Sequence, residues 1–151
     1  MVDKKSKDTI FEKEGAKEKE NPLDISWGTG TETVLLVDDD ELILEVGERL
    51  LKTMGYKVLK TESGEEAIEI YKKNKNKIEI VILDMIMPDK DGGETYDMLK
   101  KIDPGIKVLL SSGYSIDGKA TEILDRGCNS FIQKPFRMKG LAQKLREILD
   151  S

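Results

Sequence analysis

The feature that most constrains this chain is the alternation of two hydrophobic patterns from Thr33 to the C-terminal end. Short, nearly continuous apolar runs are typical of parallel strands that are covered on both faces. Between these runs, apolar residues recur every three or four positions, which is typical of amphipathic helices. The runs lie at 34–37, 80–83, 106–110 and 131–132. The pattern therefore predicts strands and helices in regular alternation.

The helical pattern predicts five helices. The first carries an apolar stripe that stops at Gly55, and the second follows a capping box at 63–66. The third and fourth fall near 92–101 and 118–126, and the fifth closes the chain. The predicted core faces are Ile43, Val46, Leu50 and Met54 in the first helix, Ala67, Ile70 and Tyr71 in the second, and Leu141, Leu145, Ile148 and Leu149 in the last.

This alternation implies five β-α units and an α/β fold class. Because crossovers between parallel strands are right-handed, such units build an open sheet with helices on both faces. We predict a doubly wound, five-stranded parallel sheet of flavodoxin-like order 2-1-3-4-5. The foldable part of the chain is too short for a second core, so a single domain is expected.

Residues able to handle a phosphoryl group follow four of the strand-like segments. Asp38 and Asp39 follow the first run, Asp84 the second, Ser112 the third and Lys134 the fourth. Parallel strands finish on a common edge of the sheet, where open α/β folds place their chemistry. Three carboxylates, a hydroxyl and a lysine are therefore expected to meet there.

The composition of this predicted site indicates metal-assisted phosphoryl transfer. Carboxylates a few ångströms apart repel one another unless a cation lies between them, and hard oxygen ligands suit Mg²⁺. One carboxylate would act as the nucleophile, and Lys134 would supply the opposing charge. The chain contains no histidine, which removes the usual zinc ligand and neutral-pH general base. Such a chain could receive a phosphoryl group from a phosphohistidine but could not be the donor.

Four motifs in this order resemble those of the response-regulator receiver domain of two-component signalling: LLVDDDELIL, VILDMIMPDKDG, VLLSSGYS and FIQKPF. The resemblance covers essentially all of 32–150. It implies that Asp84 is the phospho-acceptor in a two-component phosphorelay. It also implies that Asp39, Asp84 and the backbone carbonyl of Ile86 bind Mg²⁺ directly, and that Asp38 assists through a water molecule.

The same resemblance implies a conformational switch. Ser112 occupies the position of the switch Ser/Thr, and Phe131 that of the switch aromatic residue. Lys134 matches the lysine that precedes a typically cis proline, here Pro135. The implied function is signal relay, with a histidine kinase or phosphotransfer domain as donor and no enzymatic turnover beyond slow self-dephosphorylation. Exposed apolar residues of the first helix, Leu42 or Leu44, are candidate contacts for that donor.

Two other classes of function fit parts of the sequence. A haloacid-dehalogenase-like Mg²⁺-dependent phosphatase would use Asp38 as nucleophile and Asp40 as acid/base. It needs a late acidic pair for the metal, however, whereas only Glu147 and Asp150 follow Lys134. A flavodoxin-like mononucleotide binder is the weakest alternative, because the aspartates of the first loop would repel a phosphate.

The first 31 residues differ from the rest and predict a charged, flexible tail or interdomain linker before a receiver domain at 32–151. Residues 3–20 are almost entirely charged or polar, and Gly28–Thr31 resembles a flexible joint. Trp27 is expected either on the domain surface or against a neighbour. With no effector domain expected after the last helix, we expect a free-standing receiver or, preferably, the C-terminal receiver of a hybrid histidine kinase.

Composition limits the partners and the compartment. The net charge is -5 and the sequence pI near 5.0, so no positive field attracts nucleic acid or anionic lipid. No apolar stretch is long enough for a membrane span or resembles a signal peptide, which favours a cytoplasmic location. The single cysteine, Cys128, is interpreted as a packing residue.

Overall fold

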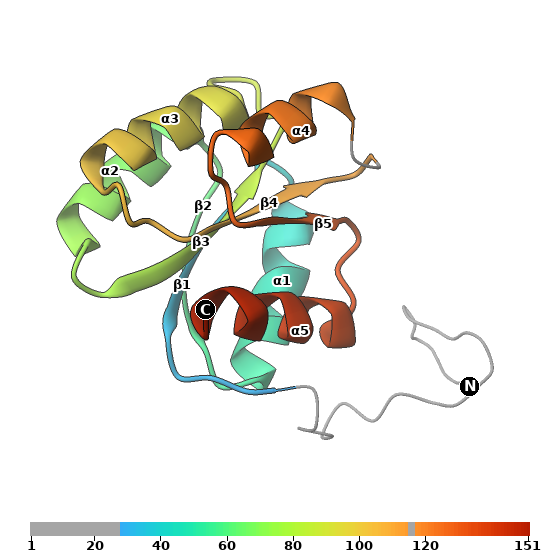
Figure 1. The fold of residues 1–151 in the computed structure, drawn as a ribbon. Helices are drawn as coiled ribbons and strands as arrows, with labels where there is room; N and C mark the ends of the chain where they lie inside the picture. Colours follow the sequence, from blue (N-terminus) through green and yellow to red (C-terminus); the bar gives the residue numbers. More distant parts are fainter. Residues whose placement is uncertain (1–27, 115–116) are drawn as a thin grey trace.

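The computed structural model describes residues 28–114 and 117–151. Five strands form one parallel sheet in the order β2-β1-β3-β4-β5, and a helix follows each strand (Figure 1). The predicted fold class and strand order are confirmed. The elements are β1 (Thr33–Val37), α1 (Glu41–Thr53), β2 (Lys57–Thr61), α2 (Gly64–Asn74), β3 (Ile78–Asp84), α3 (Gly92–Ile102), β4 (Val108–Ser112), α4 (Gly118–Asp125), β5 (Ser130–Gln133) and α5 (Met138–Leu149).

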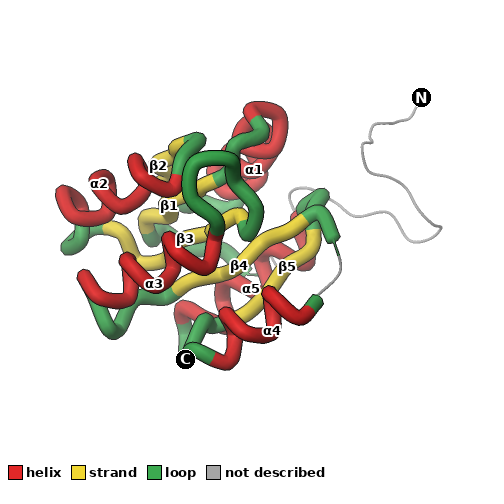
Figure 2. Tube along the Cα trace, turned by 90° about the horizontal axis from the view of Figure 1, so that it is seen from above, coloured by secondary structure: helices red, strands yellow, loops and turns green. Residues whose placement is uncertain are grey.

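The sheet lies between two helical layers, α2, α3 and α4 on one face and α1 and α5 on the other (Figure 2). Successive side chains of a strand point to opposite faces, so each strand supplies both cores. In β1, Leu35 and Val37 enter the core under α2, α3 and α4, while Val34 and Leu36 enter the core under α1 and α5. All four are fully buried, which explains why the central strands are apolar without alternation.

The strand β2 departs from the continuous apolar pattern, and none of the four predicted runs marked it. Among the strands, it pairs only with β1 and so forms one edge of the sheet. Its residues Lys57 and Lys60 are exposed. Charged side chains on an edge strand discourage pairing with another chain.

The core face predicted for α1 is partly wrong. Val46 is 40% exposed, whereas the buried positions of the helix are Leu44, Gly47 and Leu51. The reason lies in Gly47, which a count of apolar side chains overlooks. A Cβ at this position would lie 2.8 Å from Cδ2 of Leu36, so the glycine lets the helix backbone approach the sheet.

Side-chain caps begin α1 and α2. Asp40 accepts a hydrogen bond from the amide of Leu42 at 2.9 Å, and Ser63 accepts one from Glu66 at 3.0 Å. Such a cap contributes about 1 kcal/mol. Glu66 does not complete the predicted capping box directly, because its carboxylate accepts from the hydroxyl of Thr61 instead. The two caps fix the path of the chain as it leaves the ends of β1 and β2.

Cys128 occupies the core beside β4, as its packing interpretation requires. Its thiol donates to the carbonyl of Val108 at 3.5 Å, and burial raises the thiol pKa to about 11. A thiol in this state is a poor nucleophile at neutral pH. Among the described residues, no helix is long and apolar enough to cross a membrane.

Candidate functional site

The predicted site residues do converge at the carboxyl edge of the sheet. Asp38 and Asp39 follow β1, Asp84 ends β3, Ser112 ends β4, and Lys134 follows β5. The strands β1 and β4 lie on either side of β3, so Asp84 is at the centre of this edge. The buried apolar strands thus carry the polar residues to one place.

Three carboxylates form a compact cluster. Asp38, Asp39 and Asp84 each offer one carboxylate oxygen, and these atoms all lie within 4.8 Å of one another. Asp38 and Asp84 are 1% and 3% exposed, while Asp39 lies at the open side. Water can therefore screen only part of the repulsion between these charges.

Lys134 contacts the two buried carboxylates. Its Nζ lies 2.8 Å from Oδ2 of Asp38 and 3.1 Å from Oδ1 of Asp84. Its backbone amide donates to the carbonyl of Ser112 at 2.7 Å, which fixes the lysine to the end of β4. The Lys134–Pro135 peptide bond is cis, as the family resemblance implied.

The charges of the cluster shift the pKa values of its members. Burial and then the neighbouring charge of Asp38 raise the pKa of Asp84 to about 6, although Lys134 opposes both. Burial disfavours the charged form of Lys134, but its hydrogen bond to Asp38 and the charges of both carboxylates raise its pKa above the ordinary value. The cluster thus holds three carboxylates but one ammonium group, which contacts only two of them, so it favours an additional cation.

The donor set fits Mg²⁺. This ion binds oxygen ligands at about 2.1 Å, so ligands on opposite sides of it are about 4.2 Å apart. The oxygens of the cluster span no more than 4.8 Å, and small side-chain movements would bring them to that separation. Mg²⁺ also keeps several water ligands, which an open side at Asp39 permits.

The loop after Asp84 is held in a fixed shape. The amide of Gly92 donates to the carbonyl of Met85 at 2.8 Å, and a Cβ at Gly92 would lie 2.7 Å from Cα of Met85. Ile86, the predicted carbonyl ligand, lies in this loop with its amide 3.5 Å from Oδ1 of Asp84. The glycine is therefore needed for the close return of the loop to the strand.

Sequence reasoning missed Asp89, which attaches this loop to α2. Its carboxylate accepts hydrogen bonds from the amides of Gly64 and Glu65 at 3.2 and 3.1 Å. An aspartate that caps a helix from another part of the chain leaves no local signal, because the usual cap precedes its helix directly. The position of the loop thus depends on the start of α2.

Ser112 and Phe131, the two predicted switch residues, lie on neighbouring strands. Ser112 is buried, and its Oγ accepts a hydrogen bond from the amide of Tyr114 at 3.1 Å. Phe131 pairs with Leu110 in the sheet and is partly buried against the core under α2, α3 and α4. The hydroxyl of the adjacent Ser111 is buried without a hydrogen-bond partner among the described residues.

Asp40, the acid/base of the phosphatase alternative, has a different role. Its carboxylate caps α1, and its amide donates to Oδ1 of Asp38 at 2.9 Å. A carboxylate that accepts from the helix amide of Leu42 is oriented toward the helix rather than toward a leaving group beside Asp38. This geometry does not support the phosphatase alternative.

Exposed apolar side chains lie in the elements next to the cluster. They come from α1 and from the loops after β3 and β4: Leu42, Val46, Ile86 and Tyr114. Of the two candidate contacts on α1, Leu42 is 64% exposed, whereas Leu44 belongs to the core. We call these four side chains the apolar rim, and exposed apolar side chains in neighbouring elements are candidates for contact with a protein partner.

Comparison with known proteins identifies the class that this fold and site define. Residues 34–146, more than half of the chain, match the family of the response regulator receiver domain. The chain belongs to this family, whose members are phospho-acceptor signalling modules that bind Mg²⁺ at an acidic pocket and interact with histidine kinases or phosphotransfer partners. Members are generally non-catalytic, and the phosphatase alternative finds no support.

Two curated relatives show how the domain is used elsewhere. The chain is 38% identical over 137 residues to the sensor kinase CckA of Brucella abortus, covering 89% of this chain and 14% of that protein. It is 31% identical over 117 residues to the transcriptional regulatory protein GlrR of Escherichia coli, covering 78% of this chain and 26% of that protein. The chain therefore spans only a small part of the relatives that it matches.

Solved structures agree with the fold. A receiver domain protein from Clostridium thermocellum superposes with a TM-score of 0.75 at 28% identity, over 79% of this chain and 94% of that one. CheY in the CheX-CheY-BeF3-Mg complex from Borrelia burgdorferi superposes with a TM-score of 0.74 at 26% identity, over 84% of this chain and 95% of that one. Both likenesses extend over most of the described domain.

Proposed function

We propose that this domain accepts a phosphoryl group on Asp84 from the phosphohistidine of a histidine kinase or phosphotransfer domain. The observation that carries the proposal is the buried cluster of Asp38, Asp39 and Asp84 beside Lys134. Among the described residues, the hydrogen bonds to Asp84 fall on Oδ1. The second oxygen is thereby left as the nucleophile.

The transfer exchanges one bond to phosphorus for another. As the new O–P bond forms at Asp84, the N–P bond to the donor imidazole breaks and its electron pair returns to the nitrogen. Lys134 stabilises the charge that remains on the phosphoryl oxygens, since its Nζ already lies between two carboxylates. The buried position of Asp84 restricts the donor to an approach in line with the carboxylate.

Asp39, Asp84 and the carbonyl of Ile86 would hold Mg²⁺ directly, with Asp38 acting through a water molecule. When bound, the ion supplies positive charge that offsets the carboxylates and the phosphoryl oxygens. The CheY structure described above contains Mg²⁺ together with beryllofluoride, which supports the binding of Mg²⁺ beside a phosphoryl group in this domain. The three-carboxylate cluster provides the hard oxygen donors that this assignment needs.

Phosphorylation would change the conformation through Ser112 and Phe131. The phosphoryl group adds about two negative charges beside the end of β4. The Ser112 hydroxyl would then turn away from the amide of Tyr114 and donate a hydrogen bond to the phosphoryl group. Phe131 would rotate into the space that the hydroxyl leaves. The face formed by α4, β5 and α5 would present the result to a downstream protein.

We further propose that the domain works as the receiver of a hybrid histidine kinase in the cytoplasm, with residues 1–31 as its linker. The similarity to the sensor kinase CckA supports this context over a free-standing receiver. Residues 1–27 of the predicted tail at 1–31, including Trp27, lie outside the described residues.

Phosphoryl uptake from acetyl phosphate tests the proposal. With Mg²⁺ present, incorporation should reach one group per chain and stop. Asp84→Asn should abolish it, while Asp125→Asn, the same change at an exposed carboxylate on α4, should leave it intact. Sustained release of nitrophenol from p-nitrophenyl phosphate, or full labelling of Asp84→Asn, would contradict the proposed acceptor.

A further inference from the structure

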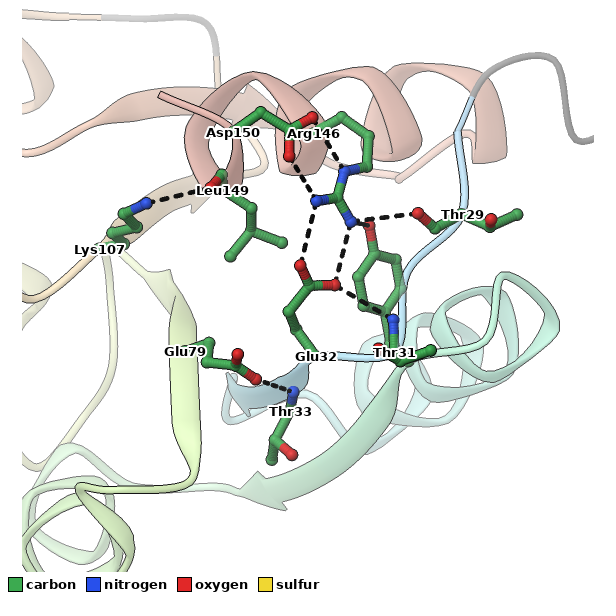
Figure 3. A network of polar contacts seen from close by, with 10 residues as sticks. Thr29, Thr31, Glu32, Thr33, Glu79, Lys107, Arg146, Leu149 and Asp150 are labelled. Carbon is green, nitrogen blue, oxygen red and sulfur yellow. Dashed lines mark hydrogen bonds and ion pairs between the residues drawn. The ribbon is translucent and has the colours of Figure 1, made fainter.

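The Gly-Thr-Gly-Thr-Glu segment just before β1 makes extensive contacts with the domain. Its principal partner is Arg146, near the end of α5 (Figure 3). Nη1 and Nη2 of Arg146 each lie 3.0 Å from one carboxylate oxygen of Glu32. Nη1 also donates to the carbonyl of Thr29 at 3.1 Å. One guanidinium therefore binds both a side chain and the backbone of the segment.

Arg146 is itself held in position by its other neighbours. Asp150 accepts from Nη2 at 2.6 Å and from Nε at 3.3 Å, and the hydroxyl of Tyr56 lies 3.3 Å from Nη1. These hydrogen bonds, first to Asp150 and then to Glu32, raise the pKa of Arg146. A planar guanidinium with all its nitrogens engaged is a specific partner rather than a diffuse positive charge.

The two glycines of the segment allow close approach to these partners. Gly28 has a φ of 114°, and a Cβ there would lie 2.6 Å from Cγ of Arg146. A Cβ at Gly30 would overlap the ring of Tyr56 and lie 2.6 Å from Nη1 of Arg146. A Cβ at Gly55 would in turn clash with the carbonyl oxygen of Gly30. Each glycine is therefore required by a contact and not only by flexibility.

Backbone hydrogen bonds continue the attachment toward β1. The amide of Gly30 donates to the carbonyl of Met54 at 3.1 Å, and the carbonyl of Glu32 accepts from Lys57 at 3.0 Å. Thr33, the first residue of β1, donates to the Glu79 carboxylate at 3.0 Å. The segment thus lies between the α1–β2 turn and the end of α5.

We propose that Gly28–Glu32 is a docked strap, an intramolecular interface in which Arg146 recognises the pattern Gly-x-Gly-x-Glu. The ordering entropy of five residues is comparable to the gain from their hydrogen bonds, so the strap depends on the charged contacts of Arg146. The chain then enters the domain at a fixed point against α5 instead of through a freely rotating joint. This role is independent of the proposed phosphorylation.

Backbone ¹⁵N relaxation and amide hydrogen exchange on the full chain test the strap. In the wild type, the amides of Thr29, Gly30 and Thr31 should be as rigid on the picosecond-to-nanosecond timescale as those of β1. Arg146→Gln should make them mobile and speed exchange at Gly30 by roughly fivefold. The matched control is Arg49→Gln, which makes the same change in an exposed pair with Glu45 on α1. It should leave the strap unchanged.

A second variant, Gly30→Ala, changes the strap instead of Arg146 and should also release the strap from the domain. Amides of β1 and β3 report whether each variant is folded. If Arg146→Gln does not fold, Gly30→Ala alone decides. Strap amides that are mobile in the wild type, or that stay rigid in a folded Arg146→Gln or in Gly30→Ala, would overturn the proposal.

Discussion

The two ends of the parallel strands use the same kinds of charged group with opposite results. We call them the carboxyl edge, which carries Asp84, and the amino edge, which carries Glu32. At the carboxyl edge, burial and the charge of Asp38 raise the pKa of Asp84 to about 6. At the amino edge, the hydrogen bond from Arg146 lowers the pKa of Glu32 below its ordinary value. Asp84 is almost fully buried, whereas Glu32 pairs with both terminal nitrogens of a guanidinium at a partly exposed position.

This difference shows how a fold makes one charged cluster reactive and another structural. A buried carboxylate that shares its counterion remains unsatisfied and gains from a metal ion or a new bond. A carboxylate with its own bidentate partner gains nothing further. Substitutions at the two ends of the strands should therefore differ in the size and sign of their effects.

Removing the cation of the carboxyl edge should have the largest effect. Lys134→Met leaves Asp38 and Asp84 buried without their counterion, and breaking a buried pair in this way costs about 3 kcal/mol or more. Urea unfolding in EDTA should show this loss of free energy of unfolding, and added Mg²⁺ should restore part of it. An unchanged urea midpoint would show that the lysine does not compensate these charges.

Removing the unsatisfied charge should instead stabilise the protein. In EDTA at pH 7, Asp84→Asn should raise the free energy of unfolding on the order of 2 kcal/mol, because the folded state no longer buries this carboxylate. The pKa of Asp84 is raised from 3.8 to about 6 on folding. Between pH 3.8 and about pH 6 the folded state binds more protons than the unfolded state, so the stability of the wild type falls as pH rises.

The gain from Asp84→Asn should therefore grow between about pH 4 and pH 6 and stay constant above that range. Asp125→Asn, at an exposed position, is the matched control and should show no such profile. A gain that is independent of pH, or a loss of stability at pH 7, would contradict the raised pKa.

A substitution on the apolar rim should slow phosphoryl transfer from a protein donor but not from a small molecule. Leu42→Glu should slow phosphoryl transfer from a histidine kinase by about tenfold, which corresponds to about 1.4 kcal/mol. Labelling from acetyl phosphate should be unchanged, because Leu42 is exposed. Met98→Glu places the same charge on another exposed apolar residue, on α3, and should affect neither rate. If Leu42→Glu slowed both reactions, Leu42 would be structural.

The smallest effect is expected at the amino edge. Arg146→Gln should lower the free energy of unfolding by about 1 kcal/mol or less, because the pair with Glu32 is partly exposed and screened by water. High salt should reduce the difference between variant and wild type in urea unfolding. A loss as large as that of Lys134→Met would mean that the two edges do not differ in the way described.

The central strands and the carboxyl edge could be predicted from the sequence because their signals are local. An apolar run followed by Asp84 or Lys134 identifies both the strand and the site residue that it carries. The edge strand β2 lacks such a run, and the buried face of α1 depends on Gly47, which has no side chain to count. Both features depend on what packs against them.

The amino edge could not be predicted because its contacts join distant polar residues. Arg146 and Glu32 are separated by 114 positions, and neither differs in sequence from an ordinary surface residue. Gly28–Thr31 indicated a flexible joint because glycine usually serves that purpose. Only the neighbouring side chains show that these glycines meet Arg146 and Tyr56.

The most direct test of the account is a comparison of amide chemical shifts with and without beryllofluoride, a phosphoryl mimic, in the presence of Mg²⁺. We expect changes in the loop at 84–92 and along 112–140, both lost in EDTA, with smaller changes at the amino edge. A response confined to 84–92 would contradict the switch through Ser112 and Phe131. No Mg²⁺-dependent response at the carboxyl edge would contradict the central claim that Asp84 accepts a phosphoryl group there.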